Sequence, residues 1–187
     1  CKPDSIPALT GIAEVLKNTG QHAKARAFYE DILKKAPNDP MVLFNYAVLL
    51  ASLGENSLAE TSFRQVIEHA SIAMQCEAYR NISIIKRYTE DDREEVEMLE
   101  KKLASHARNQ PAKTSLSYAL GKIYDDLKDY EKAAQYYTQA NTLRRKQLTP
   151  FARIKPRIEQ FEASLINTFS AAFWQEKKSN MTSDKPV

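Results

Sequence analysis

The apolar positions of the chain follow a pattern that first repeats after 34 residues. When Gly20 is aligned with Gly54, a small residue, a large apolar residue, a second small residue and an aromatic residue also coincide. A further shift of 74 residues brings the stretch 114–147 into the same register. The aligned sets are Ala13, Ala47 and Gly121; Leu16, Leu50 and Tyr124; Ala25, Ala59 and Ala133; and Tyr29, Phe63 and Tyr137. Self-similarity at a fixed period predicts a repeat architecture in which each unit is one supersecondary element.

The order of small and large positions predicts that each unit is a pair of antiparallel helices joined by a short turn. Where the helices cross, a small side chain lets the backbones approach, and Ala13 and Ala25 provide one on each helix of the first unit. Tyr29 lies four residues after Ala25 on the same helical face, where it fills the space beside the crossing. Overfilling such a crossing costs about 1–3 kcal/mol. The alanines are therefore expected for their shape.

This pattern resembles that of the tetratricopeptide repeat family. The units at residues 6–39, 40–73 and 114–147 match the family most clearly. Departures occur at Ser71, Ser117 and Lys128, where the family favours a proline, a bulky residue and a turn glycine. The resemblance implies an all-α fold, a right-handed α-α superhelix (a solenoid) of about four helix pairs.

Residues 74–113 fit the pattern less well and are interpreted as a degenerate third repeat. The apolar positions that indicate its two helices are Tyr79, Ile82, Val96, Leu99 and Leu103. The turn between the helices is longer and acidic. Within it, Thr89 with Asp92 three residues later matches the signature of a helix start.

One more helix is predicted after the fourth pair. Ile158, Phe161, Leu165 and Phe169 recur at helical spacing and mark one apolar face. Because the last apolar face of a stack of helix pairs needs a cover, residues 151–173 are predicted to form a capping helix. Residues 1–173 are then one domain, and the polar residues 174–187 are a linker toward a catalytic domain that would follow.

In the tetratricopeptide family, the first helix of each pair lines an inner surface that binds extended peptides. The groove residues carried over from the family are Phe44, Asn45, Val48, Arg80, Asn81, Ile84, Arg87, Tyr118 and Lys122. Asn45 and Asn81 are expected to hold a peptide backbone through their amides. Arg80 and Arg87 are expected to lie along one helix and to bind a carboxylate. The alternative is that these residues are only solvated or support a neighbouring helix.

The first pair argues against one known function of the family. Members that bind the carboxyl-terminal tails of chaperones grip the terminal carboxylate with a lysine and an asparagine of their first repeat. Thr10 and Glu14 occupy those positions here. Because Glu14 would repel a carboxylate, that function is disfavoured.

A basic segment follows the fourth pair. Its cations are Arg144, Arg145, Lys146, Arg153, Lys155 and Arg157. One interpretation is that they stabilise the carboxyl end of a helix. A second is a patch that docks another domain or an anion. Nucleic-acid binding is the least favoured, because no aromatic platform accompanies the cations.

A second resemblance covers residues 119–145, ALGKIYDDLKDYEKAAQYYTQANTLRR, which are similar to the last repeat of bacterial tetratricopeptide–sulfotransferases. The similar residues are Ala119, Leu120, Gly121, Lys122, Asp126, Tyr130, Ala133, Tyr137, Asn141, Leu143 and Arg144. Ala134 and Ala140 depart from that group, which favours an aromatic residue and a glycine there. The resemblance implies that a catalytic half follows Val187 and binds the sulfonate donor 3′-phosphoadenosine 5′-phosphosulfate, while this chain holds no cofactor and no catalytic residue.

The predicted function is therefore a protein- or peptide-binding module, set in the N-terminal region of a bacterial sulfotransferase. There it would present the acceptor or mediate assembly. One alternative is a freestanding adaptor or scaffold with no attached enzyme. Another is a domain that docks only to its own catalytic half. The oligomeric state is left open, a homo-oligomer included.

Composition narrows the classes of function further. Four glycines in 187 residues argue against a β-rich fold and against a glycine-rich phosphate loop. A net charge of +3 is too small to indicate nucleic-acid binding. The distant cysteines, Cys1 and Cys76, suit a reducing compartment, so a cytoplasmic location is expected. No apolar run is long enough to predict a membrane span. Because no Met opens the chain, we expect a fragment of a longer protein.

The chain offers little that resembles a catalytic or metal site. His22, His69 and His106 are too scattered to form a ligand set or a catalytic group. Paired carboxylates such as Asp91 and Asp92 are adjacent in sequence, so on a helix they point about 100° apart and do not flank a common bond. We expect no metal site and no enzymatic activity in this chain.

Overall fold

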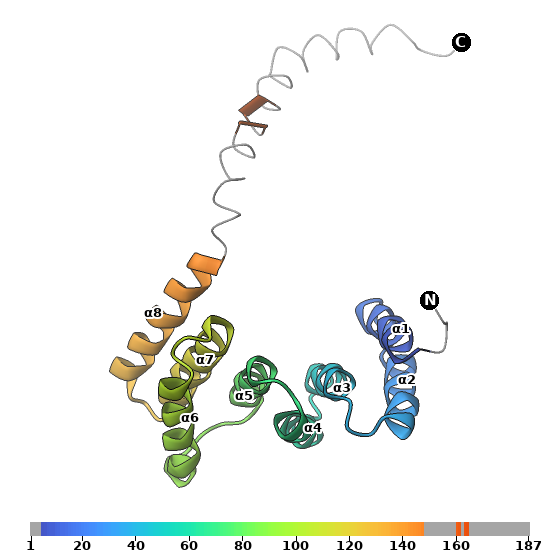
Figure 1. Ribbon diagram of the computed structural model, residues 1–187, viewed down its shortest axis with the longest axis horizontal. Coiled ribbons are helices and arrows are strands. Elements are labelled where there is room, and N and C mark those ends of the chain that lie inside the picture. The colour runs from blue at the N-terminus through green and yellow to red at the C-terminus, as the bar shows by residue number, and fades with distance from the viewer. Residues whose placement is uncertain (1–4, 148–159, 162, 165–187) are drawn as a thin grey trace, which may run out of the picture. The chain divides into compact units, whose positions relative to one another are not determined.

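The computed structural model of the protein describes residues 5–147, 160–161 and 163–164 (Figure 1). Through residue 147 the described chain is helical with short connections and contains no strand. Its elements are α1 (Ile6–Asn18), α2 (His22–Lys35), α3 (Pro40–Ser52), α4 (Asn56–His69), α5 (Ile72–Ile85), the 3₁₀ turn η1 (Glu90–Asp92), α6 (Arg93–Ser105), α7 (Gln110–Asp126) and α8 (Tyr130–Gln147). The all-α fold expected from the repeat pattern is confirmed.

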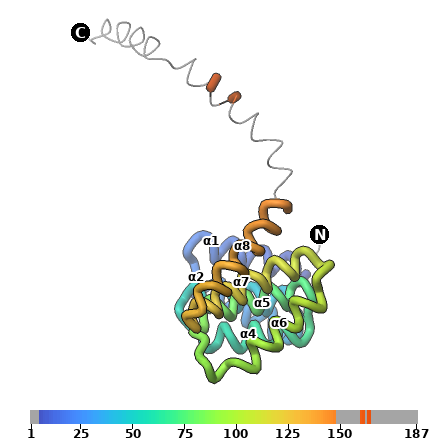
Figure 2. The backbone as a smooth tube through the Cα atoms, turned by 90° about the vertical axis from the view of Figure 1, so that its left-hand side faces the viewer, coloured from blue at the N-terminus to red at the C-terminus, as the bar shows by residue number. Residues whose placement is uncertain are grey.

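The chain divides into two compact units, Cys1–Leu143 and Arg144–Val187, and each is described by itself. In the first unit, α1 packs on α2, α3 packs on α4, and α5 packs chiefly on α4 and α7. Figure 1 shows α3 and α5 side by side with α4 beneath them. Helices α5 and α7 are also neighbours, as the perpendicular view of Figure 2 shows. We call the surface formed by α3, α5 and α7 the first-helix surface, because each of these helices opens a pair.

The helix starts follow from capping chemistry. The side chain of Asp39 accepts hydrogen bonds from the backbone N–H groups of Met41 (3.0 Å) and Val42 (3.1 Å), and Pro40 opens α3. Asn109 caps α7 in the same way by accepting from the backbone N–H of Ala112 at 3.1 Å. These side chains satisfy backbone donors that have no partner inside the helix.

The small residues lie where the repeat pattern predicts. Ala13, Ala25, Ala47 and Ala59 are fully buried, and Ala133 is 4% exposed. The aromatic residues that follow the second alanine in the first two pairs, Tyr29 and Phe63, are fully buried beside them. The predicted crossings on compact residues are therefore confirmed.

The apolar core is continuous between neighbouring pairs. Tyr29 and Ile32 of α2 share one buried cluster with Val42 and Leu49 of α3. Phe63 of α4 shares the next cluster with residues of α5, and the third cluster joins α5, α6, α7 and α8. Each pair therefore buries one face against the next, as a solenoid requires.

The turns inside the first, second and fourth helix pairs each contain a residue in the left-handed conformation. Gly20 and Gly54 each have φ of +77°, a conformation that glycine adopts without steric cost. In the fourth pair Lys128 takes the same conformation, with φ of 63°. The departure from the family's turn glycine therefore changes the residue and keeps the backbone geometry.

The connection between α5 and α6 is longer than the other turns. The backbone becomes extended at Lys86, and Tyr88, only 1% exposed, packs into the core before η1 begins. Thr89 and Asp92 form the predicted capping box, with the backbone N–H of Thr89 donating to Asp92 at 2.9 Å. The box opens the 3₁₀ turn, and α6 follows it from Arg93.

An ion-pair network holds this connection. Lys86 contacts Asp92 at 2.7 Å and Glu95 at 3.0 Å, and Arg64 of α4 contacts Glu95 at 3.1 Å. Burial opposes the ionisation of Glu95, but the hydrogen bonds and charges of Arg64 and Lys86 outweigh it and lower the pKa of this carboxyl. The Glu95 carboxylate of α6 therefore ties α4, through Arg64, and the connection, through Lys86, to α6.

Most of the predicted capping helix at 151–173 and all of the predicted linker at 174–187 lie outside the described residues. Of this part, only residues 160–161 and 163–164 are described, and they are helical. Arg153, Lys155 and Arg157 of the predicted basic patch also lie outside the described residues.

Candidate functional site

The candidate site lies on the first-helix surface, where two hollows adjoin α5. The first, which we call the cationic hollow, measures about 170 Å³ and is lined by Arg80, Ser83, Ile84, Tyr118, Lys122 and Tyr137. Four of the predicted groove residues thus come together: Arg80 and Ile84 from α5, and Tyr118 and Lys122 from α7.

Arg80 is held in place by neighbours on two helices. Its Nη1 donates to Oε1 of Glu77 at 2.7 Å, one turn earlier on α5. The guanidinium lies 5.2 Å from the centroid of the Tyr118 ring on α7, within the range of a cation–π contact. The Tyr118 hydroxyl in turn donates to Oδ1 of Asn141 at 2.8 Å, which fixes the ring. The position of Arg80 is therefore set by contacts along and across the helices.

Lys122 supplies the second cation of the cationic hollow. Its Nζ contacts Oδ1 of Asp126 at 2.5 Å, one turn later on α7. Asp126 also accepts from the backbone N–H of Tyr88 at 3.2 Å, so this pair is linked to the connection after α5. Ile84, in the same lining, is 58% exposed and supplies apolar surface beside the two cations.

The second hollow, which we call the apolar hollow, lies between α3 and the first half of α5. It measures about 370 Å³, and its lining includes Met41, Phe44, Asn45, Ala73, Met74 and Glu77. Met41 is 51% exposed. The Phe44 ring packs edge-on against Phe63, with centroids 5.5 Å apart, so its position is fixed from behind. Two predicted groove residues, Phe44 and Asn45, therefore lie in this hollow.

Glu77 links the two hollows. It lines the apolar hollow, and its carboxylate accepts from Arg80 of the cationic hollow and from the hydroxyl of Ser115 at 2.7 Å. The sequence interpretation missed Glu77, Met41 and Met74. Their spacing on the first helices was the available signal, since Glu77 lies one turn before Arg80.

The expectation that Arg87 continues the helical face of Arg80 is wrong. Helix α5 ends at Ile85, and Lys86 is extended with ψ of 140°. Arg87 is exposed in the irregular connection that follows. The physical reason is that the chain leaves the helix to bury Tyr88 and to pair Lys86 with Asp92 and Glu95. The second cation beside Arg80 is Lys122.

Two other predicted groove residues have contacts within the fold. The side-chain amide of Asn81 donates to the backbone carbonyl of Glu77 at 2.8 Å, so a peptide that takes this donor must compete with the helix. Val48 is half-buried against the second core cluster. In the first pair Thr10 is buried, and its hydroxyl donates to the carbonyl of Ile6 at 2.7 Å, whereas Glu14 is exposed.

The described part of the basic patch is the end of α8. Arg144, Arg145 and Lys146 are exposed there, in the last turn of the helix. Cations at this end complement the partial negative charge of the carboxyl terminus of a helix. The position of these cations agrees with the interpretation that they stabilise the carboxyl end of a helix. The interpretation that they dock another domain stays a prediction.

Burial raises the pKa of several side chains among the described residues. Burial raises the pKa of the Cys76 thiol to about 11, so the thiol stays protonated at neutral pH. Burial, together with a hydrogen bond to Glu100, raises the pKa of Tyr136 to about 12 and raises the pKa of Tyr124 as well.

No cluster of His, Cys, Asp and Glu suited to a metal ion occurs among the described residues. In the part of the chain that the structure describes, none of the helices combines the length and apolarity needed to cross a membrane.

Comparisons with known proteins agree with this architecture. Two family models described as tetratricopeptide repeat match the chain, one over residues 7–49 and one over residues 114–147. Among solved structures, a MamA protein, the "MamA RS-1 ArsTM double mutant", is similar in fold with a TM-score of 0.51 and 23% sequence identity, over 79% of this chain and 79% of that chain. No curated protein matches the sequence. Residues 7–49 and 114–147 therefore match the tetratricopeptide repeat, and the described part of the chain folds as an all-α solenoid of helix pairs.

Proposed function

We propose that the first-helix surface binds an extended segment of a partner protein. Tetratricopeptide repeats are non-catalytic and bind protein partners, which supports a binding role for this chain. The observation that carries the proposal is that two hollows, lined chiefly by residues of three successive first helices, adjoin one another along α5.

The dimensions of the hollows favour a peptide over a compact small molecule. Small-molecule pockets enclose about 300–1,000 Å³ and bury most of their ligand. The cationic hollow, at about 170 Å³, is smaller than that, and the apolar hollow, at about 370 Å³, is at the lower end. Hollows of side-chain size that follow one another along α5 suit an extended chain that inserts successive side chains.

The proposal is tested by selecting ligands without bias. Short random peptides displayed on phage are selected on the immobilised full chain, and the enriched peptides are measured by fluorescence anisotropy. We expect Phe44→Ala and Tyr118→Ala each to weaken binding by about tenfold, as loss of an aromatic contact residue does. Tyr130→Ala is the matched control, because this aromatic is 63% exposed and lies outside both hollows.

Each outcome decides the proposal. Weakened binding in both groove variants, with Tyr130→Ala within about twofold of the unmodified chain, supports it. Enriched peptides that bind all three variants equally, or a selection that enriches no peptide, would reject it. Circular dichroism of each variant separates lost contacts from lost folding.

We propose further that the chain is the N-terminal region of a bacterial sulfotransferase, in the cytoplasm, which presents an acceptor protein or mediates assembly. Support comes from the resemblance of residues 119–145 to the last repeat of that group. The donor 3′-phosphoadenosine 5′-phosphosulfate would then bind to the catalytic half. The gene sequence after Val187 tests this setting: a strand running into a phosphate loop supports it, and a stop codon leaves the freestanding adaptor.

The same setting assigns a role to the basic patch. If a catalytic half follows, Arg144, Arg145 and Arg153 are proposed to dock it. Reversal of these three charges should loosen the association of the two separately produced halves. Unchanged association in sedimentation velocity would contradict the docking role.

A further inference from the structure

We propose that the ligand of the first-helix surface pairs one large apolar side chain with one carboxylate, about three to four residues apart along an extended peptide. The inference rests on the proposed function, since it names the chemistry of the segment that the same surface binds.

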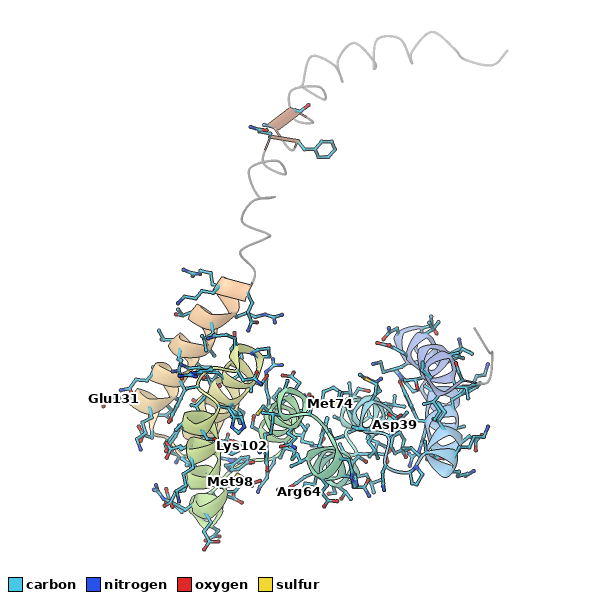
Figure 3. The ribbon with its side chains drawn as sticks, viewed as in Figure 1. Asp39, Arg64, Met74, Met98, Lys102 and Glu131 are labelled. Carbon is cyan, nitrogen blue, oxygen red and sulfur yellow. The ribbon has the colours of Figure 1, made fainter. Side chains whose placement is uncertain are left out.

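The apolar hollow selects the apolar side chain. Met41 and Met74 face it from α3 and α5, and Phe44 forms a fixed aromatic wall. Figure 3 shows Met74 on the side of the array away from Arg64 of α4, which places it on the first-helix surface. Methionine side chains are flexible and polarisable, so they adapt to apolar groups of different shape. Leucine, isoleucine, methionine and phenylalanine are the expected occupants.

The cationic hollow selects the carboxylate. Its lining includes Arg80 and Lys122 but neither of their acidic partners. Nη1 of Arg80 donates to Glu77, and Nζ of Lys122 donates to Asp126. A guanidinium has five N–H donors and an ammonium has three. Donors therefore remain for a ligand carboxylate, and the Tyr118 ring holds the guanidinium beside the hollow.

Glu77 sets which side chain enters which hollow. Glu77 is among the residues that line the apolar hollow, so a ligand carboxylate placed there would lie near a like charge. The Glu77 carboxylate also holds Arg80 at 2.7 Å on the side of the cationic hollow. Repulsion by Glu77 at the apolar hollow and attraction by Arg80 and Lys122 at the cationic hollow disfavour a peptide bound with its two groups exchanged.

The separation of the hollows sets the spacing of the two groups. On α5, Ala73, Met74 and Glu77 line the apolar hollow, and Arg80, Ser83 and Ile84 line the cationic hollow. The centres of these two sets are about eight residues apart, or about 12 Å at the rise of an α-helix. An extended peptide covers that distance in about three to four residues.

The test uses labelled synthetic peptides with a Gly-Ser background. One contains Leu-Ser-Ser-Glu and another contains the reverse order, because the direction of the ligand along α5 is unknown. Control peptides carry Gln or Lys in place of Glu, or Ser in place of Leu. Binding to the full chain is measured by fluorescence anisotropy at low and at high salt.

We expect one order of the Leu and Glu peptide to bind about tenfold more tightly than its Gln version and more tightly still than its Lys version. The preference for Glu should shrink at high salt. Arg80→Gln and Lys122→Gln should each reduce the preference for Glu over Gln, and Met74→Ser should reduce the preference for Leu over Ser.

Matched controls exist on α6. Arg93 pairs with Glu90 three residues away, as Arg80 does with Glu77, and Lys101 pairs with Glu97 four residues away, as Lys122 does with Asp126. Met98 is 37% exposed there. Arg93→Gln, Lys101→Gln and Met98→Ser should leave both preferences unchanged.

The outcomes separate this inference from the proposed function. If the Lys peptide binds as tightly as the Glu peptide, or if the α6 variants have the same effect as the α5 and α7 variants, the inference is wrong. If peptides selected from the unbiased library bind the first-helix surface but lack an apolar and acidic pair, the inference fails and the proposed function stands. If the selected peptides bind elsewhere, both fail.

Discussion

Gly121 and the ring of Tyr137 lie so close together that a side chain does not fit between them. A Cβ atom on residue 121 would lie 2.9 Å from Cδ1 and 3.0 Å from Cε1 of Tyr137. Carbon atoms pack in protein interiors at about 3.5–4.0 Å. The fourth pair therefore crosses on a glycine, whereas the first two pairs cross on the fully buried Ala13 and Ala47.

This contact predicts that Gly121→Ala destabilises the fold. Overpacking at the Tyr137 ring destabilises the fold by about 1–3 kcal/mol. The higher helix propensity of alanine relative to glycine offsets up to about 1 kcal/mol of this loss. Gly11→Ala is the matched control, because Gly11 is also in a helix but has nothing within 4 Å of its added Cβ. We expect Gly121→Ala to be less stable than Gly11→Ala by about 1–3 kcal/mol in urea denaturation.

The same measurement in a Tyr137→Ala background isolates the contact. With the ring removed, the added methyl group meets no close atom of residue 137. The difference in stability between Gly121→Ala and Gly11→Ala should then shrink, because the methyl group added at residue 121 no longer meets the Tyr137 ring. An unchanged difference would show that the Tyr137 ring is not what opposes a side chain at residue 121.

Lys128 predicts a stabilising substitution. Its φ of 63° is the conformation of Gly20 and Gly54 in the earlier turns. A residue with a Cβ is strained there by about 1–2 kcal/mol, whereas glycine is not. We expect Lys128→Gly to raise the stability by about 1 kcal/mol, after the greater chain entropy of glycine in the unfolded state is deducted. Thermal denaturation measures this gain, and Lys128→Ala, which retains the strain, should not show it.

Sequence and structure agree where a residue's role depends on its own pair of helices. Ala25 and Ala59 are small because two backbones meet there, and that requirement returns at each unit of the sequence. Lys128 differs from glycine, yet the turn survives, because the length of the turn and the packing of the two helices fix its backbone.

The parts that sequence could not predict depend on contacts between distant segments. The end of α5 at Ile85 has no proline or glycine near it to signal a stop. It is set by Tyr88, which enters the core, and by Lys86, which pairs with Asp92 and Glu95. For the same reason the partner of Arg80 in the cationic hollow is Lys122, a residue of another helix pair.

The ion-pair network around Glu95 predicts an acid-sensitive fold. The pKa values of Glu95 and Asp92 are lowered in the folded chain, so their contribution is fully present above the unfolded pKa and is lost as the pH falls through the folded pKa. Stability should therefore fall between about pH 5 and pH 3.

Glu95→Gln should reduce that fall. The variant loses about 2 kcal/mol at neutral pH, because Arg64 and Lys86 lose their shared charged partner. It should approach the unmodified chain at low pH, where Glu95 would be protonated. Glu94→Gln is the control, since this neighbouring carboxylate is exposed and should leave the pH profile unchanged. Parallel profiles for Glu95→Gln and the unmodified chain would exclude Glu95 as a source of the acid sensitivity.

The two asparagines of the first-helix surface predict unequal effects on binding. Asn45 is half-buried in the lining of the apolar hollow, whereas the Asn81 amide donates to the backbone carbonyl of Glu77. A peptide backbone that binds the Asn81 amide must replace that hydrogen bond, so it gains less there than at Asn45. Asn45→Ala should weaken the binding of a selected peptide by about fivefold to tenfold, and Asn81→Ala by less.

The double variant should retain a melting temperature within a few degrees of the unmodified chain, because both residues lie outside the fully buried core. Anisotropy titrations of the single and double variants measure these effects, and equal affinity of the double variant and the unmodified chain would show that neither amide contacts the ligand.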